Sequence, residues 1–225
     1  MPEESERDGD LSGVRFDERG LVPCVVQDWT TGEVLTLAYM NEEAMRLTRE
    51  TGEVHFFSRS RGELWRKGET SGNTLHLRQL RYDCDGDAVV ALVEPAGPAC
   101  HTGERSCFYR EVGGTAGTEK DAERADGEPV PAAHEALATL ERTLERRRVD
   151  RPAGSYTVQL LSDPERIAAK VAEEAEEVTR AAREESEQRL AEEAADVIYH
   201  LSVLLLSRGV SQAQVMEVLN GRRRS

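Results

Sequence analysis

The first half of the chain alternates short apolar stretches with turns that carry glycine or acidic residues. The apolar stretches have the length of β-strands and are rich in valine, leucine and aromatic residues, which favour an extended backbone. They cover residues 21–28, 33–40, 53–58, 74–82 and 87–94. One helix is expected between the second and third stretches, because Asn41 is a good N-cap and glutamates occupy the two positions after it. This half therefore predicts a mostly β (α+β) domain.

The second half shows helical periodicity throughout. Asp163 followed by Pro164 is typical of a helix start, and Ser211 with Gln214 forms a capping box for a short final helix. Helices are expected at residues 133–148, 164–183, 186–207 and after Ser211. The apolar stripe of the second helix runs through Ile167, Val171, Ala175 and Val178. Four helices without a strand predict an all-α domain.

Residues 111–131 separate the two halves and have the composition of a solvated linker, without aromatic side chains and rich in glycine and acids. The expected organisation is a disordered acidic tail at 1–11, a β domain at 12–112, a flexible linker at 113–131 and a helical domain at 132–225. The N-terminus lacks the features of a signal peptide, and no apolar run approaches the roughly 20 residues of a membrane helix. We therefore expect a cytoplasmic protein with no membrane partner.

Charge narrows the candidate partners. The formal net charge is −14, and both halves are acidic. A nucleic-acid-binding protein usually has a basic face, so this balance argues against nucleic acid as a partner. The balance is compatible with a small phosphorylated substrate held through metal ions, because divalent cations reverse the sign of an acidic pocket.

Three aspartates alternate with other residues in the segment "DCDGDA". If the following strand already includes this segment, its two-residue period places Asp83, Asp85 and Asp87 on one face. Cys84 then points to the other face. Three carboxylates together suit magnesium, which prefers oxygen ligands. A calcium loop is the alternative, but Ala88 stands where such a loop requires glycine, and an apolar strand follows.

Four cysteines in a cytoplasmic chain of 225 residues are not a disulfide framework. Cys24 lies in the apolar run "VPCVV" and is assigned to the core; the other three are Cys84, Cys100 and Cys107. With His101 they offer soft ligands that suit zinc, although simple burial is the alternative for a thiol. Their spacing is not that of a local zinc loop, so they can converge only through the tertiary fold or across a dimer interface. His101 is also a candidate general acid or base.

Taken with "GPACHTGERSCFYR" downstream and with "LAYMNEEAM" and "HFFSRSRGELWRKGETSGN" upstream, "DCDGDA" resembles phosphoribosyl-AMP cyclohydrolase over residues 14–112. The resemblance implies a dimeric hydrolase in which the three clustered cysteines bind zinc from both subunits and the three aspartates bind magnesium. The implied reaction adds zinc-bound water to C6 of an adenine that is alkylated at N1, and then breaks the N1–C6 bond.

The same resemblance implies a phosphate-binding role for "SRSRGELWRKGETSGN", where cationic and hydroxyl side chains lie among glycines that let backbone N–H groups approach an anion. The expected substrate-binding residues are Ser58, Arg59, Arg61, Lys67, Thr70, Ser71 and Asn73. An ordinary polar hairpin loop is the alternative.

Acidic residues recur at helical spacing in "KVAEEAEEV" and "EEAADVIYH". Glu174 and Glu177 share a helix face, and the pair Glu193 and Asp196 repeats the three-residue step. If the two helices pack antiparallel, four carboxylates meet, and their repulsion requires cations between them. A solvated acidic face is the alternative, but apolar residues surround the second pair, and half-buried acids need partners.

This paired pattern resembles the all-α nucleotide pyrophosphohydrolases. With "GSYTVQLL" upstream, the closer match is phosphoribosyl-ATP pyrophosphatase over residues 134–222. The resemblance implies magnesium on the four acids, attack of metal-held water on the α-phosphorus, and Glu173 as a further ligand or the catalytic base. Lys170 is expected either to contact phosphate or to form an ordinary ion pair with Glu174, one turn later.

Together the two resemblances imply a fused enzyme of histidine biosynthesis, because pyrophosphate release produces phosphoribosyl-AMP, the substrate of ring opening. We expect zinc and magnesium as cofactors, phosphoribosyl nucleotides as substrates, and a homodimer. A second hypothesis is a nucleoside triphosphate pyrophosphohydrolase whose zinc domain has another specificity. A third is a zinc-stabilised adaptor with a helical dimerisation module.

Overall fold

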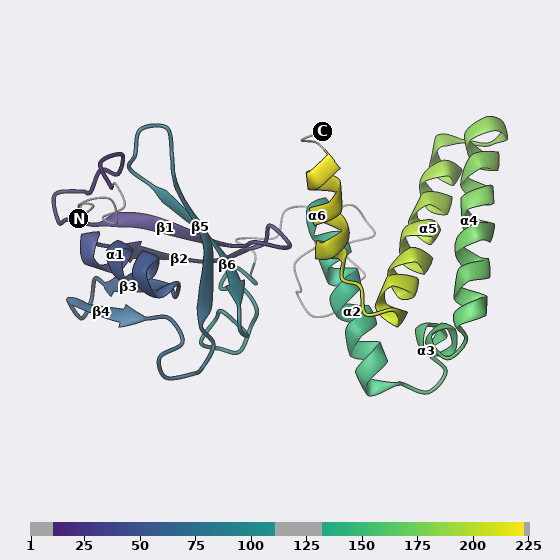
Figure 1. Cartoon of the computed structure of the whole chain (residues 1–225), viewed down its shortest axis with the longest axis horizontal. Coiled ribbons are helices and arrows are strands. Elements are labelled where there is room, and N and C mark those ends of the chain that lie inside the picture. The colour runs from purple at the N-terminus through teal and green to yellow at the C-terminus, as the bar shows by residue number, and fades with distance from the viewer. Residues whose placement is uncertain (1–10, 111–131, 223–225) are drawn as a thin grey trace, which may run out of the picture. The chain divides into compact units, whose positions relative to one another are not determined.

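The computed structural model describes residues 11–110 and 132–222, which form two compact units (Figure 1). The expected tail and linker lie outside the described residues, apart from Leu11 at the end of the tail. Within the described ranges, no helix combines the length and apolar character that crossing a bilayer requires.

The first unit contains a four-stranded sheet, a two-stranded sheet and one helix (Figure 1). The large sheet has the strand order β2 (Val34–Met40), β1 (Val22–Asp28), β6 (Val89–Pro95) and β5 (Leu75–Tyr82). Strands β1 and β6 are parallel, whereas the two outer pairs are antiparallel. The small antiparallel sheet pairs β3 (His55–Ser58) with β4 (Glu63–Arg66), and helix α1 spans Glu42–Thr51. The predicted mostly β domain is confirmed.

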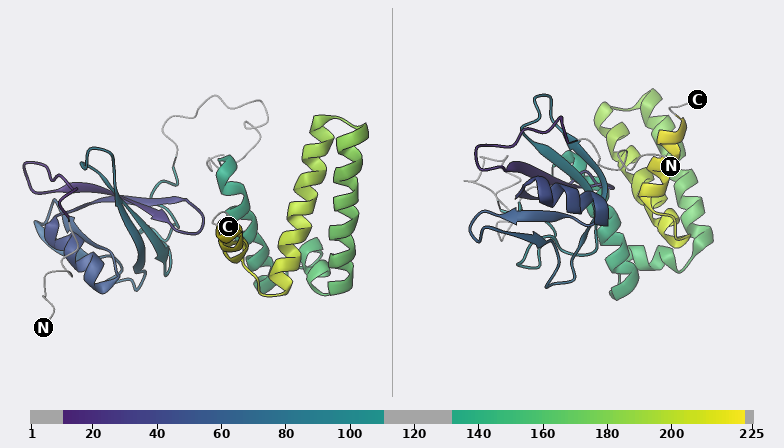
Figure 2. Two further views of the ribbon diagram at one scale, coloured as in Figure 1. Left: turned by 45° about the horizontal axis from the view of Figure 1, so that its top comes forward. Right: turned by 60° about the vertical axis from the view of Figure 1, so that its left-hand side comes forward.

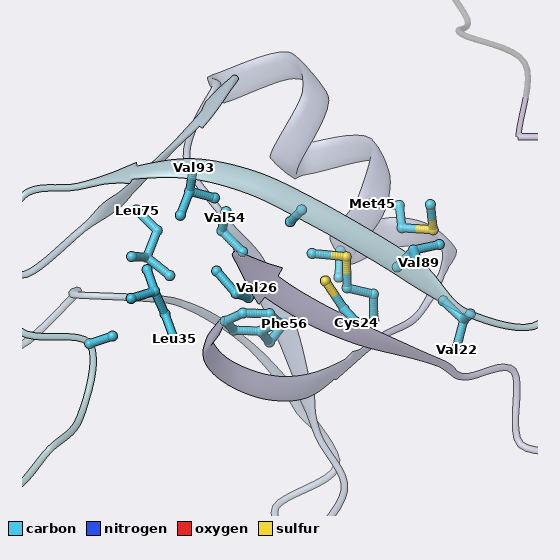
Figure 3. Close-up of a cluster of buried hydrophobic side chains, with 14 residues drawn as sticks. Val22, Cys24, Val26, Leu35, Met45, Val54, Phe56, Leu75, Val89 and Val93 are labelled. Carbon is cyan, nitrogen blue, oxygen red and sulfur yellow. The ribbon is translucent and has the colours of Figure 1, made fainter. Parts of the chain in front are cut away.

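The core of this unit follows from alternation along β1, whose residues are in turn buried and half-buried. Val22, Cys24 and Val26 point into a cluster that also contains Phe56 from β3 and Met45 from α1 (Figure 3). The assignment of Cys24 to the core is therefore confirmed. Burial raises the pKa of its thiol to about 12, which makes this cysteine unreactive.

The local signals of the first unit are mostly confirmed. All five apolar stretches form strands, and Asn41 caps α1 by accepting a hydrogen bond from the Ala44 N–H at 2.8 Å. The exception is β4, which lies in the segment expected to be a phosphate-binding loop. It forms because Trp65 can pack on Phe56 of the neighbouring strand, with ring centroids 5.2 Å apart.

The second unit is entirely helical within its described residues (Figure 2). Its elements are η2 (Ala133–Glu135), α2 (Ala136–Asp150), α3 (Tyr156–Leu161), α4 (Pro164–Glu184), α5 (Glu187–Ser207) and α6 (Gln212–Arg222). Helices α4 and α5 run antiparallel, side by side along their length. The all-α prediction is confirmed, but the count of four helices is wrong because it omits α3, which has only 6 residues.

In this unit the predicted capping residues are confirmed, but the predicted apolar stripe of α4 is partly wrong. Asp163 caps α4 by accepting a hydrogen bond from the Arg166 N–H, and Ser211 and Gln214 form the expected capping box. The predicted apolar stripe of α4 is wrong at Ala175, which is exposed. The buried positions are Ile167, Glu174 and Ala181. An acidic residue therefore lies in the middle of the buried face of α4.

Candidate functional sites

The first unit contains a pocket of about 560 Å³ that brings together most of the residues expected to bind substrate or zinc. Its walls come from β2, β4, the segment that follows β4 and the loop after β6. The predicted residues that line it are Arg61, Lys67, Thr70, Ser71, Asn73, Cys100, His101 and Cys107. Phe56 and Trp65 add an aromatic surface. A pocket of this size can hold a nucleotide-sized ligand.

Cys100 and Cys107 form a pair of thiols in this pocket that interact with each other. Hydrogen bonds lower the pKa of Cys100. The one with the largest effect is donated by the Thr102 hydroxyl, 3.0 Å from Sγ. Loss of hydration raises the pKa of Cys107, and Lys67 acts in the opposite direction. His101 lies beside the pair, with Nδ1 3.9 Å from Sγ of Cys100. The thiol of Cys100 therefore ionises more readily than that of Cys107.

The loop that carries both cysteines is held on the sheet by an arginine between two carboxylates. Nη2 of Arg105 lies 2.6 Å from Oδ2 of Asp28, and its Nε lies 2.5 Å from Oε2 of Glu33. Asp28 is only 4% exposed, and its other oxygen accepts two backbone N–H groups. The backbone N–H of Cys107 also donates to the Leu35 carbonyl at 2.8 Å. The sheet therefore determines where the two cysteines lie.

The three aspartates do cluster, but the reason expected from the sequence is wrong. Strand β6 begins at Val89, so Asp83, Asp85 and Asp87 lie in the turn between β5 and β6 and not on one face of a strand. The turn depends on Gly86, whose φ of +80° is in the left-handed region. The turn brings one oxygen of each carboxylate within 4.8 Å of the others.

Asp83 and Asp87 shift each other's pKa in opposite directions. Loss of hydration works to raise the pKa of Asp83, but hydrogen bonds from the Ala88 N–H and from Asp87 outweigh it, so this pKa is lowered. The hydrogen bond to Asp83 and the charge of Asp85 raise the pKa of Asp87. A carboxyl that resists ionisation beside two others is typical of a group that a cation can stabilise.

Cys84 lies in the same turn and does not join the other two predicted zinc ligands. It is exposed and does not line the pocket. In the described parts of the chain, no group of three close ligand atoms combines Cys84 with Cys100 and Cys107. Of the two routes that the spacing allows, convergence within one copy is therefore not observed.

Ser58 and Arg59 also lie outside the main pocket. They line an adjoining cavity of about 320 Å³ together with Tyr39 and Ser60. The Arg59 guanidinium lies over the Tyr39 ring, 3.7 Å from its centroid. The expected phosphate-binding segment is therefore divided between two cavities.

The helical unit contains a second acidic cluster. Single oxygens of Glu174, Glu177 and Glu193 lie within 4.8 Å of one another, although Glu193 is only 3% exposed. Burial raises the pKa of Glu193; the Arg189 guanidinium opposes this shift, and the carboxylates of Glu177 and Asp196 add to it. Asp196 is exposed at the edge of this group. Three of the four acids expected to meet between the antiparallel helices therefore do lie together, and Asp196 is the fourth.

Lys170 and Glu173 flank the acidic cluster. Nζ of Lys170 lies 2.8 Å from Oε2 of Glu173 and 3.4 Å from Oε1 of Glu174. The hydrogen bond to Glu173 raises the pKa of Lys170. The Glu173 side chain is 54% exposed and does not belong to the group of three. In this structure Lys170 therefore forms the ion pairs that its spacing allows.

A polar network next to the acidic cluster, centred on His200, was not expected from the sequence. His200 is 5% exposed, and its Nδ1 lies 2.9 Å from the Asp196 carbonyl oxygen and 3.6 Å from Oε1 of Glu174. Its Nε2 lies 3.2 Å from the Tyr156 hydroxyl on α3. The available signal was the spacing of seven residues between Glu193 and His200, which places both on the buried face of α5.

The two units therefore offer different chemistry. The pocket of the first unit has soft ligands, cationic groups, a histidine and an aromatic wall. The cluster of the second unit has close carboxylates, the type of ligand that magnesium prefers.

Comparison with known proteins finds a different family in each unit. Residues 36–109 match phosphoribosyl-AMP cyclohydrolase, and residues 137–223 match phosphoribosyl-ATP pyrophosphohydrolase. These two matches include the main pocket and the helical acidic cluster, respectively.

Relatives that contain both parts are similar to almost the whole chain. A histidine biosynthesis bifunctional protein of Bacillus subtilis is 47% identical over 210 residues, which cover 93% of this chain and 94% of the relative. The proteins of the same description from Thermus thermophilus and Caldanaerobacter subterraneus are 47% and 44% identical, over 96% and 95% of this chain and 94% and 98% of their own lengths. The chain therefore belongs to the family of bifunctional histidine biosynthesis proteins, with a phosphoribosyl-AMP cyclohydrolase domain followed by a phosphoribosyl-ATP pyrophosphohydrolase domain.

Proposed function

We propose that the chain performs its two hydrolyses with zinc in the cyclohydrolase domain and magnesium in both domains, as a homodimer. The helical domain releases pyrophosphate from phosphoribosyl-ATP, and the β domain opens the adenine ring of the resulting phosphoribosyl-AMP. The observation that carries this proposal is the difference between the two sites. Cys100, Cys107 and His101 share a pocket with cationic side chains, whereas Glu174, Glu177 and Glu193 form a close cluster of carboxylates.

The donor atoms of the pocket fit zinc. Cys100 and Cys107 are close enough to affect each other's pKa, and that of Cys100 is lowered, which favours the thiolate that a metal binds. Cys84 is exposed and free to meet a pair of cysteines from a second copy. Three thiolates with a fourth open position are typical of catalytic zinc, which makes a bound water acidic at neutral pH.

His101 is the group in the pocket that can move a proton. Ring opening forms a bond between the water oxygen and C6, breaks the N1–C6 bond, and requires a proton on the released N1. The imidazole of His101 lines the pocket next to Cys100, so it can take a proton from the attacking water and return it to N1. C6 stays bonded to C5 of the imidazole ring and becomes a carboxamide that keeps the exocyclic nitrogen.

The helical cluster fits magnesium. Three carboxylates lie within 4.8 Å of one another, two of them buried, and burial raises the pKa of Glu193. Magnesium would supply the charge that allows all three to ionise, and it would activate water and neutralise the leaving group. The three acids would hold the cation, and the oxygen of the attacking water would form a new bond to the α-phosphorus. Cleavage of the bond between this phosphorus and the bridging oxygen releases pyrophosphate. The aspartates of the β5–β6 turn are exposed, but they also lie within 4.8 Å of one another and offer the oxygen ligands that a further magnesium prefers.

Exposed apolar side chains support the homodimer. In the β domain Leu37 is 46% and Phe108 59% exposed, and in the helical domain Ile198 is 43% exposed. A contiguous exposed apolar patch marks a surface that binds another protein, and we propose that each of these side chains belongs to such a patch in its own domain. A dimer would also explain how a zinc site can include Cys84.

Arg105 provides a first test of the zinc site that does not depend on catalysis. Changing Arg105 to glutamine removes the link to Asp28 and Glu33, so the loop that carries the cysteines should lose its fixed position. Loss of groups that orient metal ligands typically weakens binding by about 10- to 100-fold, and we expect a zinc affinity lowered by this amount. The measurement is competition for zinc with a chromophoric chelator.

Arg46→Gln is the matched control for this variant. Arg46 also bridges two carboxylates, Glu43 and Glu50, but on the exposed surface of α1. Its zinc affinity should equal that of the wild type. Equal affinities in all three proteins would show that Arg105 does not hold the zinc ligands in place.

The proposed function is tested by incubating the purified chain with phosphoribosyl-ATP, magnesium and zinc while pyrophosphate and the ring-opened product are measured separately. Both products are expected. Release of pyrophosphate without ring opening would contradict the proposal for the β domain. If a folded, metal-loaded sample forms neither product, the better hypotheses are a nucleoside triphosphate pyrophosphohydrolase and a zinc-stabilised adaptor. Turnover of noncanonical nucleoside triphosphates would identify the pyrophosphohydrolase.

A further inference from the structure

Phosphoribosyl-AMP, the substrate on which the proposed ring opening and therefore this inference rest, carries two phosphates on one adenine. One phosphate ends the ribose on N9, and the other ends the ribose on N1. Both dianions must be bound while C6 is held at the cysteines. The β domain therefore needs two anion subsites that are connected through a surface for the base.

Two adjoining cavities of the β domain meet this requirement. The main pocket, of about 560 Å³, contains Cys100, His101 and Cys107, and the second cavity has about 320 Å³. Both are lined by Leu37, Ala38 and Trp65, so they share a wall. An indole is a suitable surface for stacking an adenine.

The cationic side chains around these cavities divide into paired and unpaired groups. Arg61 forms an ion pair with Glu63 at 2.5 Å, and Arg66 forms one with Glu53 at 2.6 Å. Lys67 and Arg59 have no carboxylate partner among residues 11–110 and 132–222. Lys67 lines the main pocket and Arg59 lines the second cavity. Each cavity thus has one cation whose charge is not already neutralised.

The surroundings of Arg59 leave its hydrogen-bond donors available. Its Cζ lies over the Tyr39 ring, 3.7 Å from the centroid, and a cation–π contact does not require its N–H donors. The N–H donors in the guanidinium plane remain free to bind phosphate oxygens in pairs. The hydroxyls of Ser58 and Ser60 line the same cavity, 3.4 Å apart. Together these groups form a candidate phosphate subsite.

We propose that the β domain binds the two phosphates in separate subsites, that of the N1-linked ribose at Lys67, Thr70 and Ser71, and that of the AMP half at Arg59, Ser58 and Ser60. N1 is bonded to C6, so the N1-linked ribose lies nearest to the cysteines. Lys67 lines the same pocket as Cys100 and Cys107, and Arg59 does not, so Lys67 is the cation on the side of the cysteines. The N9-linked phosphate lies farther from C6 and reaches the second cavity, while the adenine lies along Trp65.

Calorimetric titration with AMP and with adenosine tests the assignment, because AMP carries only the N9-linked phosphate and adenosine carries none. In Arg59→Ala the affinity for AMP should fall by about 10- to 100-fold, the loss typical of a hydrogen bond between charged groups. Adenosine should bind Arg59→Ala as it binds the wild type. Arg78→Ala removes the same charge from an exposed ion pair with Glu94 outside both cavities and should leave the AMP affinity unchanged.

Lys67→Ala separates the two subsites. This variant should bind AMP within about twofold of the wild type, because AMP lacks the second phosphate, while its KM for phosphoribosyl-AMP rises by about 10-fold or more. An unchanged AMP affinity in Arg59→Ala would overturn the inference even if the wild type opens the ring. Equal loss of AMP affinity in Arg59→Ala and Lys67→Ala would also overturn it, since both cations would then bind the same phosphate. Absence of ring opening in the wild type would contradict the proposed function instead, and the AMP titrations would still test the subsites.

Discussion

Replacing Cys107 with alanine is expected to stop ring opening while pyrophosphate release continues at the wild-type rate. Cys107 lies in the pocket of the β domain and interacts with Cys100, whereas the carboxylates proposed for pyrophosphate release all lie in the helical domain. Loss of one of the proposed zinc ligands would remove the acidification of the attacking water. Because bound zinc lowers the pKa of water to about 7, we expect a loss on the order of 10³-fold or more. The two products of phosphoribosyl-ATP turnover, measured separately, give both rates.

Cys24→Ala is the control for this variant. It removes a cysteine from the same domain, but this cysteine is fully buried in the core and does not line the pocket. We expect it to retain its zinc content and ring opening with only a modest loss of stability. Cys107→Ala should contain less than the wild-type amount of zinc after dialysis. If it kept full ring opening, Cys107 would have no place among the zinc ligands, and if it also lost pyrophosphate release, the two sites would depend on each other.

The features of the fold that could be predicted are those that a few neighbouring residues determine. The strands at the five apolar stretches, the core position of Cys24 and the caps at Asn41 and Asp163 all occur where the sequence places them. Strand β4 could not be predicted in this way, because its stability comes from pairing with β3 and from Trp65 packing on Phe56. Helix α3 is too short to show a periodic pattern, and its Tyr156 is joined to α5 through His200.

The candidate sites show the same limit. The sequence identifies the residue types that bind metals, but their grouping depends on contacts between distant segments. The aspartates cluster because of a turn at Gly86 and not because of strand periodicity. Cys84 has the right chemistry but lies away from Cys100 and Cys107 within one chain. A prediction from spacing alone cannot distinguish ligands that one chain brings together from ligands that a second copy has to supply.

Burial of acids on α4 and α5 is the feature that distinguishes the helical site from an ordinary charged surface. Glu174 lies between Ile167 and Ala181 on the buried face of α4, and Glu193 is 3% exposed on α5. Keeping carboxylates there is unfavourable unless cations compensate them. His200 and the ion pairs of Lys170 and Arg189 hold the cluster without neutralising it completely. This combination fits the magnesium site that we propose for the helical domain.

Replacing Glu177 with glutamine should abolish pyrophosphate release from phosphoribosyl-ATP while leaving ring opening of added phosphoribosyl-AMP unchanged. The substitution keeps the shape of the side chain and removes one of the three close carboxylates. Since losing a group that only orients a metal ligand already costs about 10- to 100-fold, loss of a ligand should cost at least roughly 100-fold. The apparent affinity for magnesium should fall in parallel, which a magnesium titration of the pyrophosphate release rate measures.

Glu176→Gln is the matched control, because Glu176 is the adjacent glutamate on α4, is exposed, and does not belong to the close group of three. It removes the same charge from the same helix, so a general effect of net charge would appear in both variants. We expect wild-type pyrophosphate release from Glu176→Gln. Normal release from Glu177→Gln would exclude Glu177 from the magnesium site. Equal losses in the two variants would mean that the acidic surface acts through its total charge, and the close grouping of Glu174, Glu177 and Glu193 would then have no special role in catalysis.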